Sequence, residues 1–209
     1  MSQAPTNQVR AAHRADTAAV VRTLTRAFHD DPVFRWLFPD DATRRRDTAR
    51  FFAIYAGLDH VPAGRCEVAV TEPSTGTVRG AAIWHSPKDR RAAPLELLRT
   101  APHYLSLFHR RLPRVVRALA HVERQAPAQP HWYLADIGTD PAARGQGVGS
   151  ALLRSGLARA DAERMPTYLE SSSVDNIAFY ERFGFELCGE ITGTDYPTMY
   201  RMWRPAQGA

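Results

Sequence analysis

The fold of this chain depends on a segment that reads Ile137-Gly138-Thr139-Asp140-Pro141-Ala142-Ala143-Arg144-Gly145-Gln146-Gly147-Val148-Gly149-Ser150-Ala151-Leu152-Leu153. The apolar run at residues 131–137 predicts a strand that ends at the Gly/Asp/Pro turn. Apolar residues from Leu152 onward recur at helical spacing and predict a helix. The glycines between them allow positive φ angles and leave room for a phosphate against the unpaired amides of a helix start. The segment therefore predicts a strand, an anion-binding loop and a helix.

The spacing of the glycines separates this loop from two other phosphate loops. A Rossmann loop needs Gly-x-Gly-x-x-Gly near the start of its βαβ unit, and a P-loop needs Gly-Lys-Ser/Thr. Residues 144–149 (Arg-Gly-Gln-Gly-Val-Gly) instead match Arg/Gln-x-x-Gly-x-Gly/Ala. That pattern resembles the acetyl-CoA pyrophosphate loop of the GCN5-related N-acetyltransferase (GNAT) family. Downstream, residues 176–185 (Asn-Ile-Ala-Phe-Tyr-Glu-Arg-Phe-Gly-Phe) resemble that family's second signature, so the chain is identified as a member.

The order of predicted elements gives the fold class. The 209 residues show no break in composition and no internal repeat, which predicts a single domain over residues 1–209. Strands are expected at 9–13, 65–71, 77–85, 131–137, 166–170, 185–191 and 196–203. Helices are expected at 16–28, 43–58, 94–124 with breaks at Pro102 and Pro113, after the glycine loop, and at 175–183. Together with the resemblance, this order implies an α/β (α+β) GNAT fold: a central mixed β-sheet flanked by helices. A helical insertion at about residues 94–125 precedes the fourth strand, and residues 131–185 form the acetyl-CoA-binding core.

Composition bears on the cellular compartment and on the classes of binding partner. Cys66 and Cys188 lie far apart with no Cys-x-x-Cys or His cluster, which predicts a cytoplasmic protein with no disulfide framework and no metal site. No apolar run approaches the roughly 18 residues that span a bilayer, so no membrane partner is expected. The net charge of +5 is carried almost wholly by arginine. The excess is open to two readings: the codon usage of a GC-rich genome, or attraction of a polyanion. No nucleic-acid-binding motif accompanies it, so the polyanion expected under the second reading is CoA rather than nucleic acid.

The resemblance implies acetyl-CoA as co-substrate. The backbone of Ile137 and Thr139 would meet the acetyl and pantetheine groups, and loop amides would meet the pyrophosphate. Because amides do the binding, we expect side-chain changes at Gln146 to matter little and Gly147→Val to abolish binding. The full set implied for acetyl-CoA is Ile137, Gly138, Thr139, Arg144, Gly145, Gln146, Gly147, Val148, Gly149, Ser150, Asn176 and Phe179.

Transfer of an acetyl group to an amine needs a proton acceptor for the amine and a proton donor for the leaving thiolate. The resemblance implies Tyr180 as the donor. Counting back by twos from Thr139 places Ile137, Ala135 and Tyr133 on the cofactor side, whereas Asp136 is expected on the other face. Glu170 is therefore the first candidate for the base and Asp31 the next, and each reads equally well as a structural carboxylate.

The acceptor side is less defined. Residues 32–39 form either a capping turn packed on the core or, as the resemblance implies, part of the acceptor wall. Carboxylates suit a cationic amine and aromatic rings suit its flat portion. The candidate substrate-binding residues are Asp30, Asp31, Phe34, Trp36 and Tyr133.

Within the family, the chain looks most like the puromycin N-acetyltransferase type of small-molecule enzymes. This implies transfer of an acetyl group to a primary amine of a small molecule, with antibiotics and aminonucleosides among the candidates. The alternatives are a protein N-terminal or lysine acetyltransferase and a non-catalytic CoA-binding regulatory module. The helical insertion would cover the acceptor site or form the contact of a homodimer.

Overall fold

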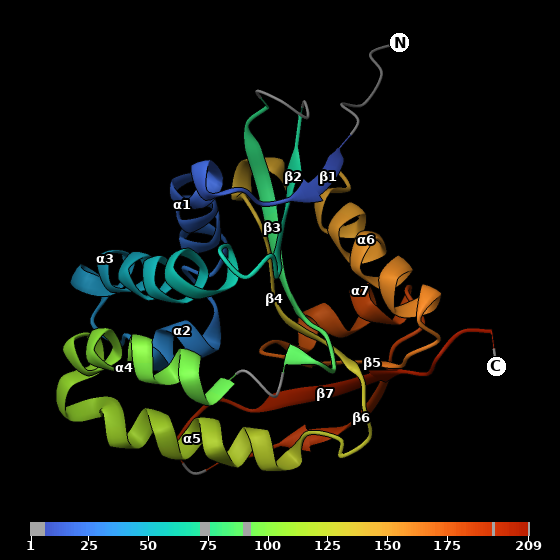
Figure 1. The fold of residues 1–209 in the computed structure, drawn as a ribbon. Helices are drawn as coiled ribbons and strands as arrows, with labels where there is room; N and C mark the ends of the chain where they lie inside the picture. The colour runs from blue at the N-terminus through green and yellow to red at the C-terminus, as the bar shows by residue number, and fades with distance from the viewer. Residues whose placement is uncertain (1–6, 72–75, 90–92, 194, 209) are drawn as a thin grey trace.

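A computed structural model describes residues 7–71, 76–89, 93–193 and 195–208. Its centre is one seven-stranded sheet in the order β1-β2-β3-β4-β5-β7-β6 (Figure 1). The strands are β1 (Gln8–Ala11), β2 (Cys66–Val70), β3 (Val78–His85), β4 (Trp132–Thr139), β5 (Thr167–Ser171), β6 (Glu186–Ile191) and β7 (Met199–Arg204). The predicted mixed sheet is confirmed. The last strand starts later than expected, at Met199.

The pairing of β4 opens the sheet in its middle. Strands β4 and β5 are parallel, and only Trp132 and Tyr133 of β4 find partners on β5. The other pairs are antiparallel. On the opposite side, Ile83 of β3 pairs with Asp136 and Trp84 pairs with Leu134, so Ala135 is an extra residue in β4. Such a bulge bends its strand, and β4 diverges from β5 beyond Tyr133.

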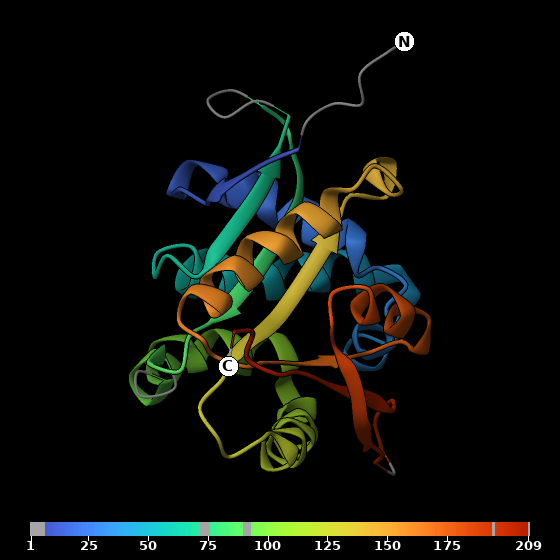
Figure 2. The same ribbon diagram turned by 90° about the vertical axis from the view of Figure 1, so that its right-hand side faces the viewer.

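Helices cover both faces of the sheet. They are α1 (Thr17–Ala27), α2 (Pro32–Leu37), α3 (Asp41–Phe52), the π-helix η2 (Ala53–His60), α4 (Ala93–Phe108), α5 (Leu112–Gln125), α6 (Val148–Ala162) and α7 (Ile177–Glu181). Helices α1 and α3 lie on one side of β3 and β4, and α6 lies on the other (Figure 1). Figure 2 shows α6 crossing the strands on the face turned toward the viewer. Within the described ranges, no helix has the length and apolar character to cross a membrane.

Each face has its own hydrophobic core. Val20 and Leu24 of α1 are fully buried against Phe52 and β2–β3, which confirms the predicted apolar face of α1. On the other face, Leu152 and Leu153 of α6 pack with Trp84. The helix can approach this indole because residue 156 is glycine: a Cβ there would lie 2.1 Å from the Trp84 ring. The sheet is therefore held in place from both sides.

The helical insertion differs from the prediction in one respect. Helix α4 continues through Pro102, so the expected break there is wrong, whereas Pro113 stands in the first turn of α5, where proline is tolerated. Helix α4 packs on α3 and η2, and these tertiary contacts stabilise it despite the missing amide. The segment at 32–39 also differs from a simple turn. It forms α2, because the Asp31 carboxylate accepts hydrogen bonds from the amides of Val33 and Phe34.

Candidate functional site

The glycine loop leads into α6 with its amides free. Gly145 and Gly147 have φ angles of 73° and 76°, a region that L side chains rarely adopt. Gly147 is the N-cap of α6 and supplies no side chain to cap it. Among the described residues, the amides from Gly145 to Ser150 find no hydrogen-bond acceptor. Because these amides stand at the positive end of a helix, the loop fits an anionic group such as the CoA pyrophosphate.

A cavity of about 430 Å³ starts at this loop and continues between β4 and β5 where the two strands diverge. At the loop end, its wall includes Thr139 and Arg144. Its wall also includes Ile137, Gly138 and Asn176. Of the predicted cofactor residues, Ile137, Gly138 and Thr139 of β4, Arg144 of the loop and Asn176 before α7 thus line one cavity, whereas residues 145–150 and Phe179 are not part of its lining.

Tyr180 also lines this cavity. Its side chain is 7% exposed and packs against Phe179 and Phe185 at ring-centroid distances of 5.2 and 5.9 Å. Burial raises the pKa of the Tyr180 hydroxyl, with a contribution from the nearby carboxylates of Asp136 and Asp31. The phenol therefore keeps its proton at neutral pH and can donate it inside the cavity.

Asp136 contributes a carboxylate that the alternation of β4 did not assign to the site. The bulge at Ala135 shifts the alternation, so Ala135 packs toward α1 and α3 while Ile137 packs toward α6. The predicted common face of Ile137, Ala135 and Tyr133 is therefore wrong. Asp136 does lie on the face away from α6, as expected, yet it lines the cavity. Burial raises the pKa of Asp136 to about 7, within the range of a group that exchanges protons near neutrality.

Tyr55 of η2 faces Asp136. Its hydroxyl lies close enough to the Asp136 carboxylate to lower the pKa of Asp136 against the effect of burial. The neighbouring carboxyl of Asp31 acts in the opposite direction and raises that pKa. The sequence predicted one continuous helix over residues 43–58. It did not assign Tyr55 to the site, because the chain changes from α-helix to π-helix after Phe52.

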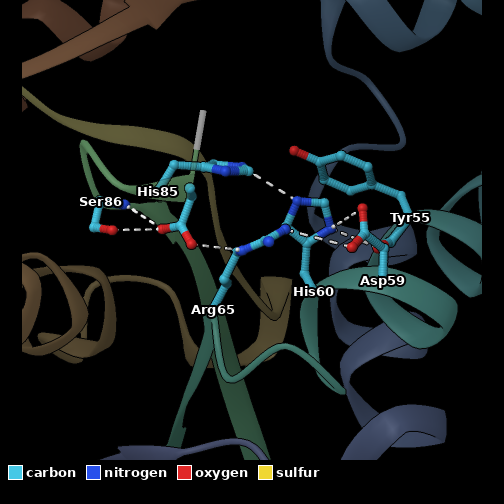
Figure 3. A network of polar contacts seen from close by, with 7 residues as sticks. Tyr55, Asp59, His60, Arg65, His85 and Ser86 are labelled. Carbon is cyan, nitrogen blue, oxygen red and sulfur yellow. Dashed lines mark hydrogen bonds and ion pairs between the residues drawn. The ribbon is translucent and has the colours of Figure 1, made fainter. Parts of the chain in front are cut away.

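A polar network beneath Tyr55 fixes its position (Figure 3). The Nδ1 atom of His60 lies 2.6 Å from the Tyr55 carbonyl oxygen, and the Nε2 atoms of His60 and His85 are 3.2 Å apart. Arg65 donates to Asp59 at 3.4 Å and to Asp89 at 3.1 Å. The network therefore links η2 to the start of β2 and to the residues that follow β3.

Glu170 and Tyr133 form a half-buried, hydrogen-bonded pair. The Tyr133 hydroxyl donates to Glu170 Oε2 at 2.7 Å. Burial raises the pKa of the Glu170 carboxyl, and it raises the pKa of the Tyr133 phenol well above its ordinary value. Glu170 lines the cavity, so the structure brings this predicted residue to the site and places Tyr133 as its support.

Asp31 reaches the cavity as well, with both carboxylate oxygens engaged. Its Oδ1 accepts from the amides of Val33 at 2.8 Å and Phe34 at 3.2 Å, and its Oδ2 accepts from the Ser172 hydroxyl. Burial raises the pKa of Asp31. Asp31 therefore joins the start of α2 to the end of β5 across the cavity.

Three of the other predicted acceptor residues lie away from the cavity lining. Asp30 is exposed and pairs with Arg35 at 3.0 Å. Phe34 is buried in the core, stacked on Phe52 at 5.1 Å. The Trp36 indole donates to the carbonyl of Asp195 and lies under the Arg114 guanidinium at 5.4 Å. Arg114 also donates to Asp195, so the insertion is attached to the loop between β6 and β7.

Sequence reasoning missed Asp136, Tyr55 and Ser172 as site residues. One signal was available for Asp136: it is the lone charged residue between apolar neighbours in a central strand. No signal marked Tyr55, because its contact depends on the π-helix. Within the described ranges, no group of His, Cys, Asp and Glu is arranged to hold a metal ion.

Comparisons with known proteins agree with this geometry. Residues 19–185 match the sequence profile of the Acetyltransferase (GNAT) family. A solved structure described as histone acetyltransferase HPA2 and related acetyltransferase, from Corynebacterium glutamicum, is 31% identical, covers 97% of this chain and 98% of its own, and has a TM-score of 0.74. The polyamine N-acetyltransferase of Drosophila melanogaster shares the fold at 16% identity and a TM-score of 0.59, over 96% of this chain and 100% of its own.

An uncharacterized N-acetyltransferase of Schizosaccharomyces pombe is 28% identical over 184 residues, which are 81% of this chain and 70% of the yeast protein. The family profile spans most of the chain and includes both the glycine loop and the segment with Tyr180. The chain belongs to the GNAT family of acetyltransferases.

Proposed function

We propose that this protein is an acetyl-CoA-dependent N-acetyltransferase that acylates a primary amine of a small, cationic molecule. One observation carries the proposal: a single cavity is lined at one end by the glycine-loop residue Arg144 and farther in by Asp31, Asp136 and Glu170. Carboxylates in a partly dry cavity attract a protonated amine and also supply a group to deprotonate it.

The residues of the chain divide the chemistry between them. Bound acetyl-CoA supplies an acetyl group activated as a thioester. Asp136 accepts a proton from the ammonium group, and the freed nitrogen lone pair forms the new C–N bond as the C–S bond breaks. Tyr180 donates its proton to the departing sulfur, and the second proton, which the nitrogen loses once it is acylated, restores the Tyr180 phenol. Asp136 and Tyr180 face the same cavity, so both proton transfers take place inside it.

We assign Asp136 rather than Glu170 as the base. Tyr133 donates to Glu170 at 2.7 Å, and Asp31 uses its oxygens for the start of α2 and for Ser172, whereas burial raises the pKa of Asp136 to about 7, which suits a base that works near neutral pH. Asp136 directly precedes Ile137 and Gly138, whose backbone faces the expected position of the acetyl group. Glu170 and Asp31 are then the groups that hold the positive charge of the acceptor.

The relatives support a small amine as acceptor without identifying it. The Drosophila structure with the same fold is described as a polyamine N-acetyltransferase that forms N-acetylagmatine. The narrower resemblance to puromycin-type enzymes, and with it an antibiotic or aminonucleoside acceptor, stays a prediction.

A protein substrate is the second candidate, because the Corynebacterium relative is described as a histone acetyltransferase and related acetyltransferase. The insertion counts against it: Arg111 donates to the carbonyls of Trp36 and Leu37, which attaches the start of α5 to α2. A purely CoA-binding module is disfavoured because Asp136 and Tyr180 are both present at the cavity.

The test is a screen of acetyl-CoA consumption against polyamines, arylalkylamines, aminonucleosides, aminoglycosides and lysine-containing peptides, with mass spectrometry of each product. We expect turnover with at least one small cationic amine, and its loss in Asp136→Asn. Turnover with peptides alone would favour the second candidate. CoA binding without acetylation of any amine would contradict the enzymatic assignment.

A further inference from the structure

The glycine loop is hydrogen-bonded to two residues that lie far from it in the sequence and outside the two family signatures at residues 144–149 and 176–185. Asn7 directly precedes β1, and Arg79 lies near the start of β3. We propose that Asn7 and Arg79 are positioning residues that hold the loop through Gln146, with its amides turned toward the pyrophosphate. The proposal rests on the proposed function, because it concerns how the acetyl-CoA site is built.

Asn7 holds the orientation of the peptide group between Gln146 and Gly147, whose carbonyl would repel an anion if it turned toward the loop amides. Its Nδ2 atom donates to the carbonyl oxygen of Gln146 at 2.7 Å. That carbonyl lies between Gly145 and Gly147, the two glycines with positive φ, where a peptide plane can turn over at little cost. A carbonyl turned inward would place a negative dipole end in the cradle. The hydrogen bond from Asn7 holds the oxygen away from the space where the amides converge.

Arg79 closes the arrangement into a ring of hydrogen bonds. Its Nη1 donates to Asn7 Oδ1 at 2.9 Å, and its Nη2 donates to Gln146 Oε1. The other end of the Gln146 amide donates from Nε2 to the Ala142 carbonyl at 3.0 Å. Both ends of the Gln146 side chain are therefore engaged, in contrast to the expectation that changes there matter little. Arg79 also keeps a positive charge beside the loop.

These bonds act on the loop more than on the global fold. Gln146 is exposed, and surface hydrogen bonds add little to overall stability. A loop that is ordered before binding avoids the entropy cost of ordering on the ligand. Loss of the ring should therefore weaken binding of the diphosphate while the distant proton-transfer residues keep their geometry.

The experiment compares Asn7→Ala and Arg79→Met with wild type and with Arg26→Met. Arg26 pairs with Asp140 at 3.3 Å at the start of the same loop, so its variant removes an equal charge but leaves the ring intact. Calorimetry gives the Kd for CoA, thermal unfolding checks the fold, and steady-state kinetics separate KM from kcat. S-acetylpantetheine serves as a donor that has the thioester but no pyrophosphate.

For Asn7→Ala we expect the Kd for CoA and the KM for acetyl-CoA to rise roughly tenfold, with kcat and the melting temperature unchanged. Arg79→Met should raise the Kd for CoA and the KM for acetyl-CoA further, whereas Arg26→Met should raise them clearly less. The rate with S-acetylpantetheine should be equal in all four proteins. An unchanged Kd in Asn7→Ala, or an equal loss with S-acetylpantetheine, would overturn the proposal while the proposed function stands. Absence of CoA binding by the wild type would instead overturn the proposed function and this inference with it.

Discussion

The Tyr55 hydroxyl of the π-helix η2 lies near the Asp136 carboxylate of β4, and each group shifts the pKa of the other. The Tyr55 ring is held between Phe51, at a centroid distance of 5.4 Å, and His60, at 4.1 Å. Residues five apart in an α-helix point about 140° away from each other. The contact of the Tyr55 ring with the His60 ring therefore requires the wider turn of the π-helix, a feature often found at functional sites.

The first prediction concerns the proton accepted by Asp136. The carboxyl must be ionised to act as a base, and burial raises its pKa to about 7. We therefore expect kcat/KM to fall as the pH drops through about 7 and to reach a plateau above it. Asp136→Asn should lower kcat by about 10²–10⁴-fold at all pH values. A pH–rate profile of both proteins checks this, and a profile of Glu170→Gln that lost the acidic limb would reassign the base to Glu170.

The second prediction isolates the Tyr55 hydroxyl. As a hydrogen-bond donor near the carboxylate, the hydroxyl favours the ionised form and so lowers the pKa of Asp136. In Tyr55→Phe the ring stays but this donor is lost, so the acidic limb should move upward by about one pH unit. Tyr104→Phe is the matched control, because Tyr104 lies in the same aromatic cluster and feels the Asp136 charge without bonding to it. Equal profiles for the two variants would contradict the assignment.

The third prediction is a pH dependence of stability. The folded protein holds the Asp136 proton more tightly than the unfolded chain does, because the pKa rises from 3.8 to about 7 on folding. The resulting stabilisation is complete below about pH 4 and is lost as the pH rises through 7. Asp136→Asn removes this dependence. It should be more stable than wild type at pH 8, on the order of 1–4 kcal/mol in the free energy of unfolding, and close to wild type near pH 4. Urea unfolding of both proteins at several pH values measures the difference in the free energy of unfolding. A difference that stays constant with pH would contradict the raised pKa of Asp136.

The fourth prediction separates binding from chemistry at Tyr180. The phenol is buried and lines the cavity, where its proton is available to the leaving sulfur. Tyr180→Phe keeps the packing against Phe179 and Phe185. We expect kcat to drop by about 10²-fold or more while the Kd for acetyl-CoA changes little. An unchanged kcat would remove the role in proton donation.

The sequence was sufficient for features that depend on local patterns. The glycine spacing around Gly147 predicted the loop before α6, and the alternation of apolar residues predicted most of the sheet. It was insufficient where tertiary contacts decide. Helix α4 passes through Pro102 because neighbouring helices support it. The bulge at Ala135 changes which side chains of β4 share a face, and no residue in this part of the sequence signals a bulge. Asp136 was therefore placed on the correct face but not in the cavity.

The most direct test of the account is calorimetric titration of CoA into wild type and Gly147→Val. Gly147 has a φ of 76°, which a β-branched residue adopts only with strain. If the free amides from Gly145 to Ser150 bind the pyrophosphate, wild type binds CoA with a measurable Kd and the variant loses that binding while remaining folded. Equally tight CoA binding by both proteins, or no heat with either, would contradict the account.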